Sequence, residues 1–294
     1  MIAVLGAMGH RTVLSAPPRR VVSLVPSETE AWVALGGLAS LVGRTDYCVT
    51  PASVAAVTSV GGTKDARLDD IVALAPDLVL CNQEENTEAV VRGLARAGVA
   101  YHLSFPKTVR DAVGLVDDLA RLQGLDPAAV DECITLRAAV AEAEARRGDR
   151  APLRVFCPIW MDPLMTVHGD TFISDMLDLC GGYNVFSDRP RRYPLAADRG
   201  LAAPWDALRV AGRDTRYPRV TLDELVAAAP ELVLLPDEPH PFSEADAAVF
   251  RGLDLAAARD GRVLRVPGRH LSWYSTAMAE SIAAVTGWID QARR

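Results

Sequence analysis

Several aromatic side chains lie beside prolines, glycines and acidic residues, in segments with the composition of loops. A flat apolar ring with a polar edge suits a large planar ligand, and a few such rings can form the walls of a binding pocket. Alternatively, each ring fills the interior between packed elements. As a set they favour a pocket, and the candidate wall residues are Tyr47, Trp160, Phe242, Trp273 and Tyr274.

A polar run directly follows one apolar segment. Its side chains could bind the amide groups of a ligand or a cation, or they could simply form a solvated loop. The run consists of Glu84, Glu85 and Asn86.

Two histidines could each offer an imidazole to a metal. His240 lies between two prolines beside Asp237 and Glu238, and His270 precedes an LSWYS segment. The HxH, HExxH and paired-cysteine spacings of dedicated metal sites do not occur in the sequence. We therefore expect recognition of a metal inside an organic chelate rather than of a bare ion, with His240 as the candidate metal contact.

Four arginines flank two RYP motifs and could form charge-assisted hydrogen bonds to a phosphate or carboxylate of a ligand. The alternative is a set of solvated surface side chains. These residues are Arg191, Arg192, Arg216 and Arg219.

Signals of catalysis are weak. The sequence contains no nucleophile elbow, no phosphate-binding GxxxxGK loop and no GxGxxG after the first expected strand. Cys81 and Cys157 end apolar runs and are expected to pack rather than react. An enzyme that uses Cys48, Glu238 and His240 as nucleophile, acid or base remains an alternative to a binding protein.

The elements that position these residues are indicated by an internal repeat. LDDIVALAPDLVL at Leu68–Leu80 recurs as LDELVAAAPELVL at Leu222–Leu234. Each copy predicts a short helix, a proline that ends it, and a strand buried on both faces. Two such units indicate two similar α/β lobes, and ligands of such lobes bind at the loops that follow the carboxyl ends of the strands.

The beginnings of the two lobes also match. Arg20–Val25 predicts a strand, and Ser27–Glu30 offers a capping box for the next helix. Arg154–Phe156 predicts the corresponding strand, followed by a long loop at 158–170 and a helix at Phe172–Leu179.

One long helix is expected to join the lobes. Asp126-Pro127 offers an N-cap and a first-turn proline, and no glycine or proline follows before Gly148. The predicted organisation is an N-terminal lobe at 1–124, a linking helix at 125–150 and a C-terminal lobe at 151–294, with an insertion or long loop at 189–219.

Composition limits the possible partners. A net charge of −7 and a pI near 5.3 argue against nucleic acid. No apolar stretch approaches the roughly 20 residues that span a bilayer, so membrane insertion is not expected. The first residues lack the basic start of a secretion signal, and the five cysteines show no close spacing. These features predict a cytoplasmic protein with reduced thiols.

The chain resembles the class III periplasmic-binding-protein superfamily, and within it the helical backbone metal receptor or cobalamin-binding-like subgroup. The segments that carry the resemblance include RRVVSLVPSETEAWVALG, GRTDYC, the two repeat copies, CNQEEN, PIWMDPLMTV, GGYNVF, LLPDEPHPF and LSWYS. They span nearly the whole chain in order. The resemblance implies two Rossmann-like lobes with parallel-rich sheets, joined by one long α-helix, and a cleft that holds cobalamin or an iron chelate.

Receptors of this superfamily present one acidic side chain on each lobe to arginines of an ABC permease. The matching positions are Asp69 and Asp223, although carboxylates at a helix start also favour the helix dipole. We therefore expect a cytoplasmic, non-enzymatic protein that binds a small metal-chelate ligand, with Glu85, Arg216 and His240 as orienting groups. If an export signal was removed, the alternative is the substrate-binding component of an ABC importer.

Overall fold

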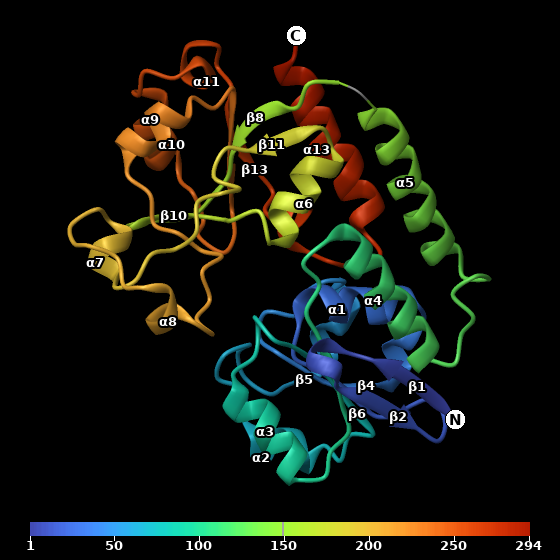
Figure 1. The fold of residues 1–294 in the computed structure, drawn as a ribbon. Helices are drawn as coiled ribbons and strands as arrows, with labels where there is room; N and C mark the ends of the chain where they lie inside the picture. Colours follow the sequence, from blue (N-terminus) through green and yellow to red (C-terminus); the bar gives the residue numbers. More distant parts are fainter. Residues whose placement is uncertain (149) are drawn as a thin grey trace. The chain divides into compact units, whose positions relative to one another are not determined.

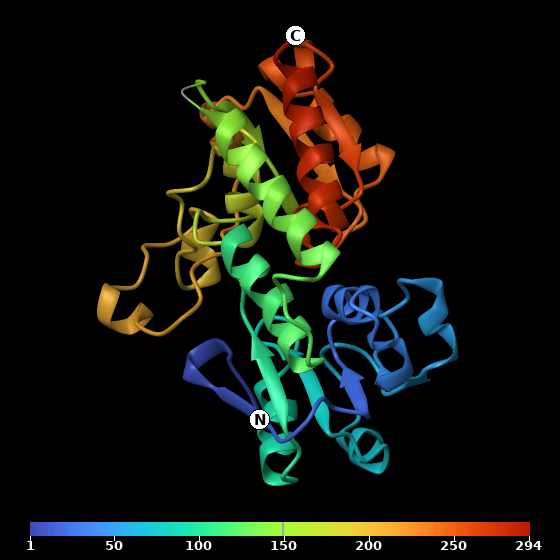
Figure 2. The same ribbon diagram turned by 90° about the vertical axis from the view of Figure 1, so that its right-hand side faces the viewer.

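The computed structural model describes residues 1–148 and 150–294, an α/β chain (Figures 1 and 2). The chain divides into two compact units. Unit 1 comprises Met1–Pro106, Arg110–Ala139 and Trp273–Ala279, and unit 2 comprises Lys107–Val109, Val140–Ser272 and Glu280–Arg294. The grouping of Trp273–Ala279 with unit 1 was not expected from the sequence, and the lobe boundaries at 124 and 151 remain a prediction.

Unit 1 is built on a five-stranded parallel sheet with the strand order β5-β4-β3-β6-β7. The strands are β3 (Val21–Ser23), β4 (Leu41–Arg44), β5 (Thr58–Ser59), β6 (Leu78–Asn82) and β7 (Tyr101–Ser104). A separate antiparallel hairpin is formed by β1 (Ile2–Leu5) and β2 (Arg11–Leu14). The helices along this part of the chain are α1 (Pro26–Ala34), α2 (Leu68–Ala73), α3 (Glu88–Arg96) and α4 (Val109–Leu122).

Unit 2 is built on a four-stranded parallel sheet with the order β11-β8-β12-β13. These strands are β8 (Leu153–Phe156), β11 (Gly182–Asn184), β12 (Leu232–Pro236) and β13 (Val263–Val266). Helices α9 (Leu222–Ala228), α10 (Glu244–Arg251) and α11 (Ala256–Arg259) lie on one side of the sheet, and α6 (Phe172–Leu179) and α13 (Met278–Ala292) lie on the other (Figure 1). The short helices of this unit are α7 (Leu195–Asp198), α8 (Ala207–Val210) and α12 (Arg269–Ser272).

The two repeat copies fold alike, which confirms the predicted helix and buried strand in each. Copy one forms α2 and β6, and copy two forms α9 and β12. Ala75 and Ala229, which precede the prolines, share a left-handed backbone with φ of 43°. In each unit an arginine at the start of the first strand of the parallel sheet donates to the carbonyls at that turn. Arg20, directly before β3, donates to Leu74 and Ala75, and Arg154, the second residue of β8, donates to Ala228 and Ala229. The duplication therefore extends beyond the thirteen repeated residues.

Helix α5 (Asp131–Arg147) begins five residues later than the predicted N-cap. Asp126 does not cap it, because its carboxylate and carbonyl accept the amides of Ala128 and Ala129 in a separate turn. The 17 helical residues span about 25 Å, less than the length expected from the sequence. The division between the units falls within this helix, between Ala139 and Val140.

Two local predictions were wrong. Helix α1 starts at Pro26 with Val25 as its N-cap, so Ser27 does not open a capping box and Glu28 falls inside the first turn. The expected long loop after β8 instead contains an antiparallel hairpin, β9 (Pro158–Met161) and β10 (Leu164–Thr166). The sequence signal for this hairpin was weak, because Asp162-Pro163 interrupts a run without regular alternation.

Each unit has its own hydrophobic core. In unit 1, Val22, Ile71, Val79 and Leu94 are buried between the sheet and its helices. In unit 2, Phe156 contacts Phe186 edge-on at 5.6 Å and lies 6.0 Å from Phe250. Among the described residues, no helix is both long enough and apolar enough to cross a bilayer.

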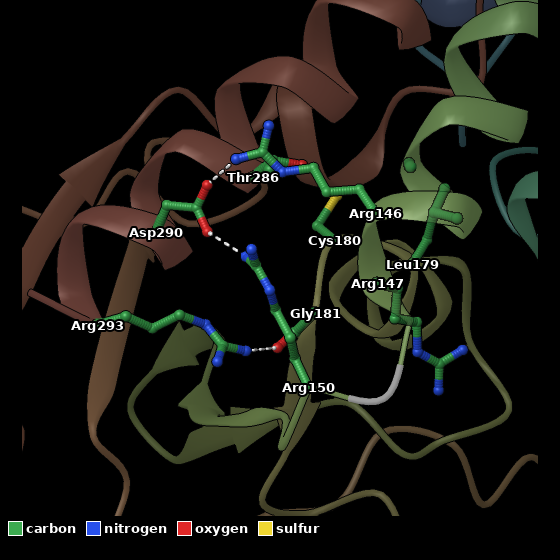
Figure 3. A pocket seen from close by; sticks show the side chains of 10 residues that line it. Arg146, Arg147, Arg150, Leu179, Cys180, Gly181, Thr286, Asp290 and Arg293 are labelled. Atoms are coloured by element: carbon green, nitrogen blue, oxygen red, sulfur yellow. Dashed lines mark hydrogen bonds and ion pairs between the residues drawn. The ribbon is translucent and has the colours of Figure 1, made fainter.

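The carboxyl-terminal part of α5 lies beside α13 in both ribbon views (Figures 1 and 2), and Arg146 there pairs with Asp290. A small cavity of about 20 Å³ opens beside this contact (Figure 3). Its arginines are engaged locally, because Arg150 lies 3.9 Å from Asp290 and Arg293 donates to the carbonyl of Gly181 at 2.8 Å. This cavity is a packing feature rather than a ligand site.

Candidate functional site

An exposed aromatic face is built on the hairpin of unit 2. Met165 of β10 lies directly opposite Trp160 of β9, and on its other side Met165 pairs with Arg219 in an antiparallel bridge. Directly opposed residues of antiparallel strands project from the same face, so these three side chains form one row. The Trp160 side chain is 43% exposed, and its indole nitrogen donates to the carbonyl of Asp162 at 3.1 Å.

His240, from the loop after β12, packs against this row. Its ring centroid lies 5.3 Å from that of Trp160 and 4.7 Å from that of Phe242. Its Nε2 atom lies 3.7 Å from the Asp246 carboxylate, too far for a hydrogen bond. We refer to Trp160, Met165, Arg219 and His240 as the hairpin face.

Unsatisfied polar atoms concentrate at the hairpin face. Among the described residues, four buried side-chain polar atoms lack a hydrogen-bond partner: Glu28 Oε2, Arg191 Nε, Arg219 Nε and His240 Nε2. Arg219 and His240 belong to the face, and Arg191 is close enough to lower the pKa of Arg219 by its charge. Leaving such a group unpaired destabilises a protein by about 1–3 kcal/mol, and such groups call for a functional explanation. The hairpin face therefore combines apolar side chains with buried polar atoms that lack a hydrogen-bond partner.

No metal centre is built here. Among residues 1–148 and 150–294 no group of three or more His, Cys, Asp or Glu side chains could hold an ion. His240 faces two rings and the Asp246 carboxylate, and its contact with a metal inside a bound chelate stays a prediction.

A buried polar chain lies at the carboxyl edge of the sheet in unit 1. Asn82 Nδ2 donates to Ser104 Oγ at 2.9 Å, and Ser104 Oγ donates to Glu28 Oε1. Glu28 is fully buried. Burial raises the pKa of its carboxyl to about 8, despite the hydrogen bond from Ser104, and the charge of Glu85 adds to the rise. The sequence analysis assigned Glu28 to a helix cap, and no pattern in the sequence signals this burial.

The predicted polar run after β6 separates into two kinds of residue. Asn86 is buried, accepts the amide of Asn82 at 2.8 Å and donates to the carbonyls of Leu24 and Thr63. Its side chain thus holds the loop, which corrects its assignment as a ligand contact. Glu84 and Glu85 stay partly exposed, and burial raises the pKa of Glu85.

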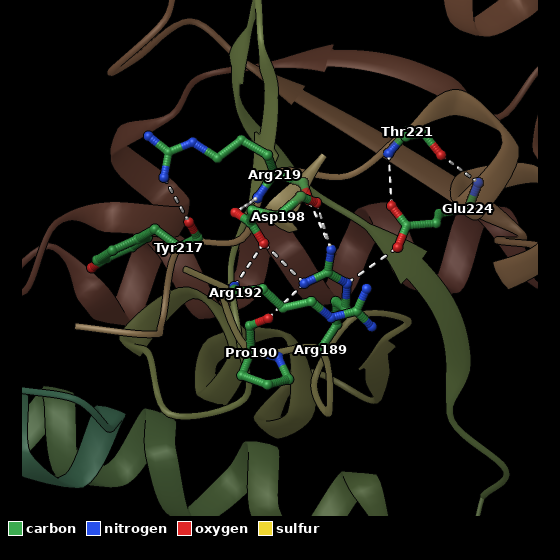
Figure 4. A network of polar contacts seen from close by, with 8 residues as sticks. All are labelled: Arg189, Pro190, Arg192, Asp198, Tyr217, Arg219, Thr221 and Glu224. Atoms are coloured by element: carbon green, nitrogen blue, oxygen red, sulfur yellow. Dashed lines mark hydrogen bonds and ion pairs between the residues drawn. The ribbon is translucent and has the colours of Figure 1, made fainter. Parts of the chain in front are cut away.

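The segment at 189–219 is mostly irregular, as predicted, but it is anchored by Asp198 (Figure 4). The buried Asp198 carboxylate accepts the Arg189 guanidinium at 3.0 Å and the backbone amides of Arg192 and Arg219 at 2.8 Å each. Arg189 also pairs with Glu224 at 3.2 Å. The Arg219 side chain leaves this network and runs toward Tyr217, whereas Arg216 pairs with Asp214 at 2.6 Å. Arg216 thus has an acidic partner of its own, and its role as an orienting group stays a prediction.

The remaining predicted residues lie in varied surroundings. Phe242 is 1% exposed and belongs to the core of unit 2, so its prediction as a pocket wall is wrong. Tyr274 is also buried, whereas Tyr47 is 65% exposed and Trp273 is half-buried. Asp69 and Asp223 are exposed in the first turns of α2 and α9, where docking to a partner remains a prediction.

The five cysteines are free and buried. Burial raises the pKa of every thiol, to about 12 for Cys157, and it outweighs the hydrogen bonds to Thr29 and Thr45 that lower the pKa of Cys48. A buried thiol with a raised pKa is a poor nucleophile. The site thus gives little support to chemistry at Cys48.

We expect none of the five thiols to react with a water-soluble alkylating reagent at pH 8 in the native protein, because burial denies access and disfavours the thiolate. All five should react in denaturant. Mass spectrometry after timed alkylation counts the labels. Fast labelling of Cys48 in the native protein would revive the enzyme alternative.

Sequence and structure comparisons now place this architecture among known proteins. The profile of the periplasmic binding protein family matches residues 21–95. The vitamin B12-binding protein of Photorhabdus laumondii subsp. laumondii is 26% identical over 238 residues, which are 80% of this chain and 76% of that protein. That of Yersinia pseudotuberculosis serotype O:1b is 30% identical over 192 residues, which are 65% of this chain and 69% of the relative. The chain belongs to the class III periplasmic-binding-protein superfamily.

Membership of this superfamily confirms the resemblance inferred from the sequence and the predicted α/β fold. The periplasmic heme-binding protein of Roseiflexus sp. RS-1 has the same fold, with a TM-score of 0.74 and 18% identity, over 94% of this chain and 99% of that chain. The hairpin face of unit 2 and the carboxyl-edge loops of unit 1 are therefore parts of a class III fold.

Proposed function

We propose that this chain is a non-catalytic substrate-binding protein for a large metal-chelate ligand. The single observation that carries the proposal is the hairpin face, where an exposed indole and a methionine lie beside two side chains, Arg219 and His240, that each have a buried polar atom without a hydrogen-bond partner. Indole and thioether groups suit a planar apolar ring, and the polar atoms can orient it. The names of the relatives support this ligand class, because vitamin B12 and heme are both metal chelates of a large macrocycle.

Contacts from unit 1 extend the proposal. Tyr47, Glu84, Glu85 and Trp273 lie in loops or turns and are not fully buried, so their side chains remain proposed ligand contacts. Asp69 and Asp223 remain proposed docking residues for an ABC permease.

The relatives favour the exported alternative over the predicted cytoplasmic location, because the similar solved structures are named as periplasmic proteins. We therefore propose that the chain works as the binding component of an importer. The competing enzyme hypothesis has less support, since Cys48 is buried with a raised pKa and the Glu238 carboxylate accepts a hydrogen bond from Ser272 at 3.2 Å.

A visible-absorption titration tests the proposal. Cobalamin and ferric protoporphyrin IX are added separately to the purified protein, and a saturable spectral shift with one-to-one stoichiometry is expected for at least one of them. The absence of any shift with either chelate, in protein whose circular dichroism shows a folded state, would contradict the proposed function.

Truncation of the exposed indole should weaken binding. Trp160→Ala is expected to raise the dissociation constant of the bound chelate by about 10- to 100-fold, because an aromatic wall contributes as a binding hot spot. The matched control is Trp205→Ala, since Trp205 stacks on Tyr193 in the same unit and lies outside the hairpin face. Equal affinities of wild type and Trp160→Ala would place the ligand elsewhere.

A further inference from the structure

Arg191 and Arg219 are two cations close enough for their charges to interact, and neither is in an ion pair with a described residue. No carboxylate in the described part of the chain lies within ion-pair distance of either guanidinium, whereas Arg189 and Arg216 each have acidic partners. The Nε atoms of both are buried and unpartnered. Burial lowers the pKa of Arg219, and the positive charge of Arg191 lowers it further. Neither guanidinium forms an ion pair in the described part of the chain, although the charge of Asp198 acts on Arg219 and that of Asp214 acts on Arg191.

The pair lies at the edge of the hairpin face. Arg219 is opposite Met165, which is opposite Trp160, so a ring that packs on the indole and the thioether extends toward Arg219. The Arg191 guanidinium stacks 4.5 Å above the Tyr193 ring, which restricts its orientation. Pre-oriented guanidinium groups offer forked donors that match a carboxylate or a phosphate.

The surrounding charge strengthens this preference. The segment at 189–219 has eight arginines and three aspartates and therefore carries a net formal charge of +5, although the whole chain carries −7. A concentration of positive charge in an acidic protein attracts an anion to that region. The two carboxylates whose charges act on the pair form their hydrogen bonds elsewhere, because Asp198 binds Arg189 and two backbone amides and Asp214 pairs with Arg216. They therefore offset the positive charge of the pair only in part.

We propose that the ligand of the hairpin face is an anionic chelate, whose carboxylate or phosphate group is bound by Arg191 and Arg219. This inference rests on the proposed function and narrows its ligand class from metal chelates in general to those with an oxyanion arm.

Two matched pairs of probes test the inference. Ferric protoporphyrin IX carries two carboxylates, and its dimethyl ester carries none. Cobalamin carries a phosphodiester, and cobinamide, which lacks the nucleotide, does not. Affinities are measured by absorption titration at low and at high salt. In at least one pair we expect the charged member to bind about 10- to 100-fold more tightly, the range of one or two charge-assisted hydrogen bonds, with a difference that shrinks at high salt.

Variants assign the preference to the pair. Arg191→Gln and Arg219→Gln should each reduce binding of the probe with the anionic group by about 10-fold or more beyond any loss for its partner without that group, and circular dichroism shows that the variant is folded. The matched control is Arg209→Gln, which removes the same charge from the same segment, where Arg209 stacks 3.8 Å from the Trp205 ring. If Arg209→Gln weakens binding of the anionic probe equally, the loss comes from the total positive charge of the segment, and the proposed site at Arg191 and Arg219 is overturned.

The outcomes separate the two proposals. Equal binding of charged and uncharged members in both pairs would overturn the anionic class while the binding function stands. Binding of none of the four probes would contradict the proposed function, and the inference that rests on it would fall as well. A charge preference that Arg191→Gln and Arg219→Gln abolish and Arg209→Gln preserves would support the site.

Discussion

Replacement of Asp198 by alanine is expected to lower the free energy of unfolding by about 3 kcal/mol, because it removes one of the two carboxylate partners of a largely buried arginine, which keeps Glu224. The Asp198 side chain has no exposed surface, and that of Arg189 is 11% exposed. The same carboxylate accepts two backbone amides, from Arg192 and Arg219, which would also lose their partner. Urea unfolding followed by circular dichroism measures the change.

Asp206 supplies the matched control for this result. It lies in the same segment, is exposed and caps only α8, where it accepts the amide of Arg209 at 2.9 Å. Asp206→Ala should therefore lower stability by about 1 kcal/mol or less. If Asp198→Ala is no more destabilising than Asp206→Ala, the segment is not anchored as the contacts indicate.

Replacement of Glu28 by glutamine should change how stability depends on pH. The folded protein holds the Glu28 proton up to a pKa of about 8, because the carboxyl is buried, whereas the ordinary pKa of a glutamate is 4.5. Between these values the folded state binds more protons than the unfolded state, so the free energy of unfolding falls as the pH rises. The stabilisation is complete below pH 4.5 and is lost as the pH passes 8. Glutamine keeps the neutral shape and has no proton to lose.

The expected difference is large. Above pH 8 the Glu28→Gln variant should be more stable than wild type by about 3–5 kcal/mol, and the two should be equal below pH 4.5. Thermal and urea unfolding between pH 4 and pH 9 provide the curves. His102 affects stability in a lower pH range. Burial and the charge of His10 lower its pKa from 6.5 to about 4, so the free energy of unfolding that it contributes is lost as the pH falls below 6.5. Comparison of variant and wild type at each pH removes that contribution.

Glu88→Gln controls for the loss of a carboxylate, since Glu88 is exposed and pairs only with Arg92 within α3. Its curve should run parallel to that of wild type. Parallel curves for Glu28→Gln as well would show that Glu28 is not held protonated in the folded protein.

The sequence predicted the parts of the fold that have strong local signals. Leu68–Leu80 and Leu222–Leu234 each combine an acidic helix start, a proline and a buried apolar run, and each folds as expected. The helix starts near Pro26 and Asp126 were not predicted correctly, because a proline or an aspartate can begin a helix or form a turn. Tertiary contacts decide between these alternatives. The hairpin at 158–166 depends on pairing that short apolar runs do not specify.

The candidate site was predicted only in part. Trp160, His240 and the arginines were chosen by residue type, but their grouping depends on cross-strand register. Met165 was not predicted as a site residue, because a single methionine in an apolar run is typical of the hydrophobic core. Phe242 and Asn86 were misassigned, since one aromatic or amide residue in a loop sequence fits a core or a loop-holding role equally well. Glu28 was missed because its burial arises from β6 and β7, far along the chain.

A crystal structure of the protein with whichever chelate binds in the titration is the most direct test of the central claim. We predict that the plane of the chelate packs on Trp160 and Met165 within about 4.5 Å, the distance of apolar contact. Its anionic arm should face Arg191 and Arg219. A bound chelate that touches neither Trp160 nor Met165 would contradict the assignment of the hairpin face as the ligand site.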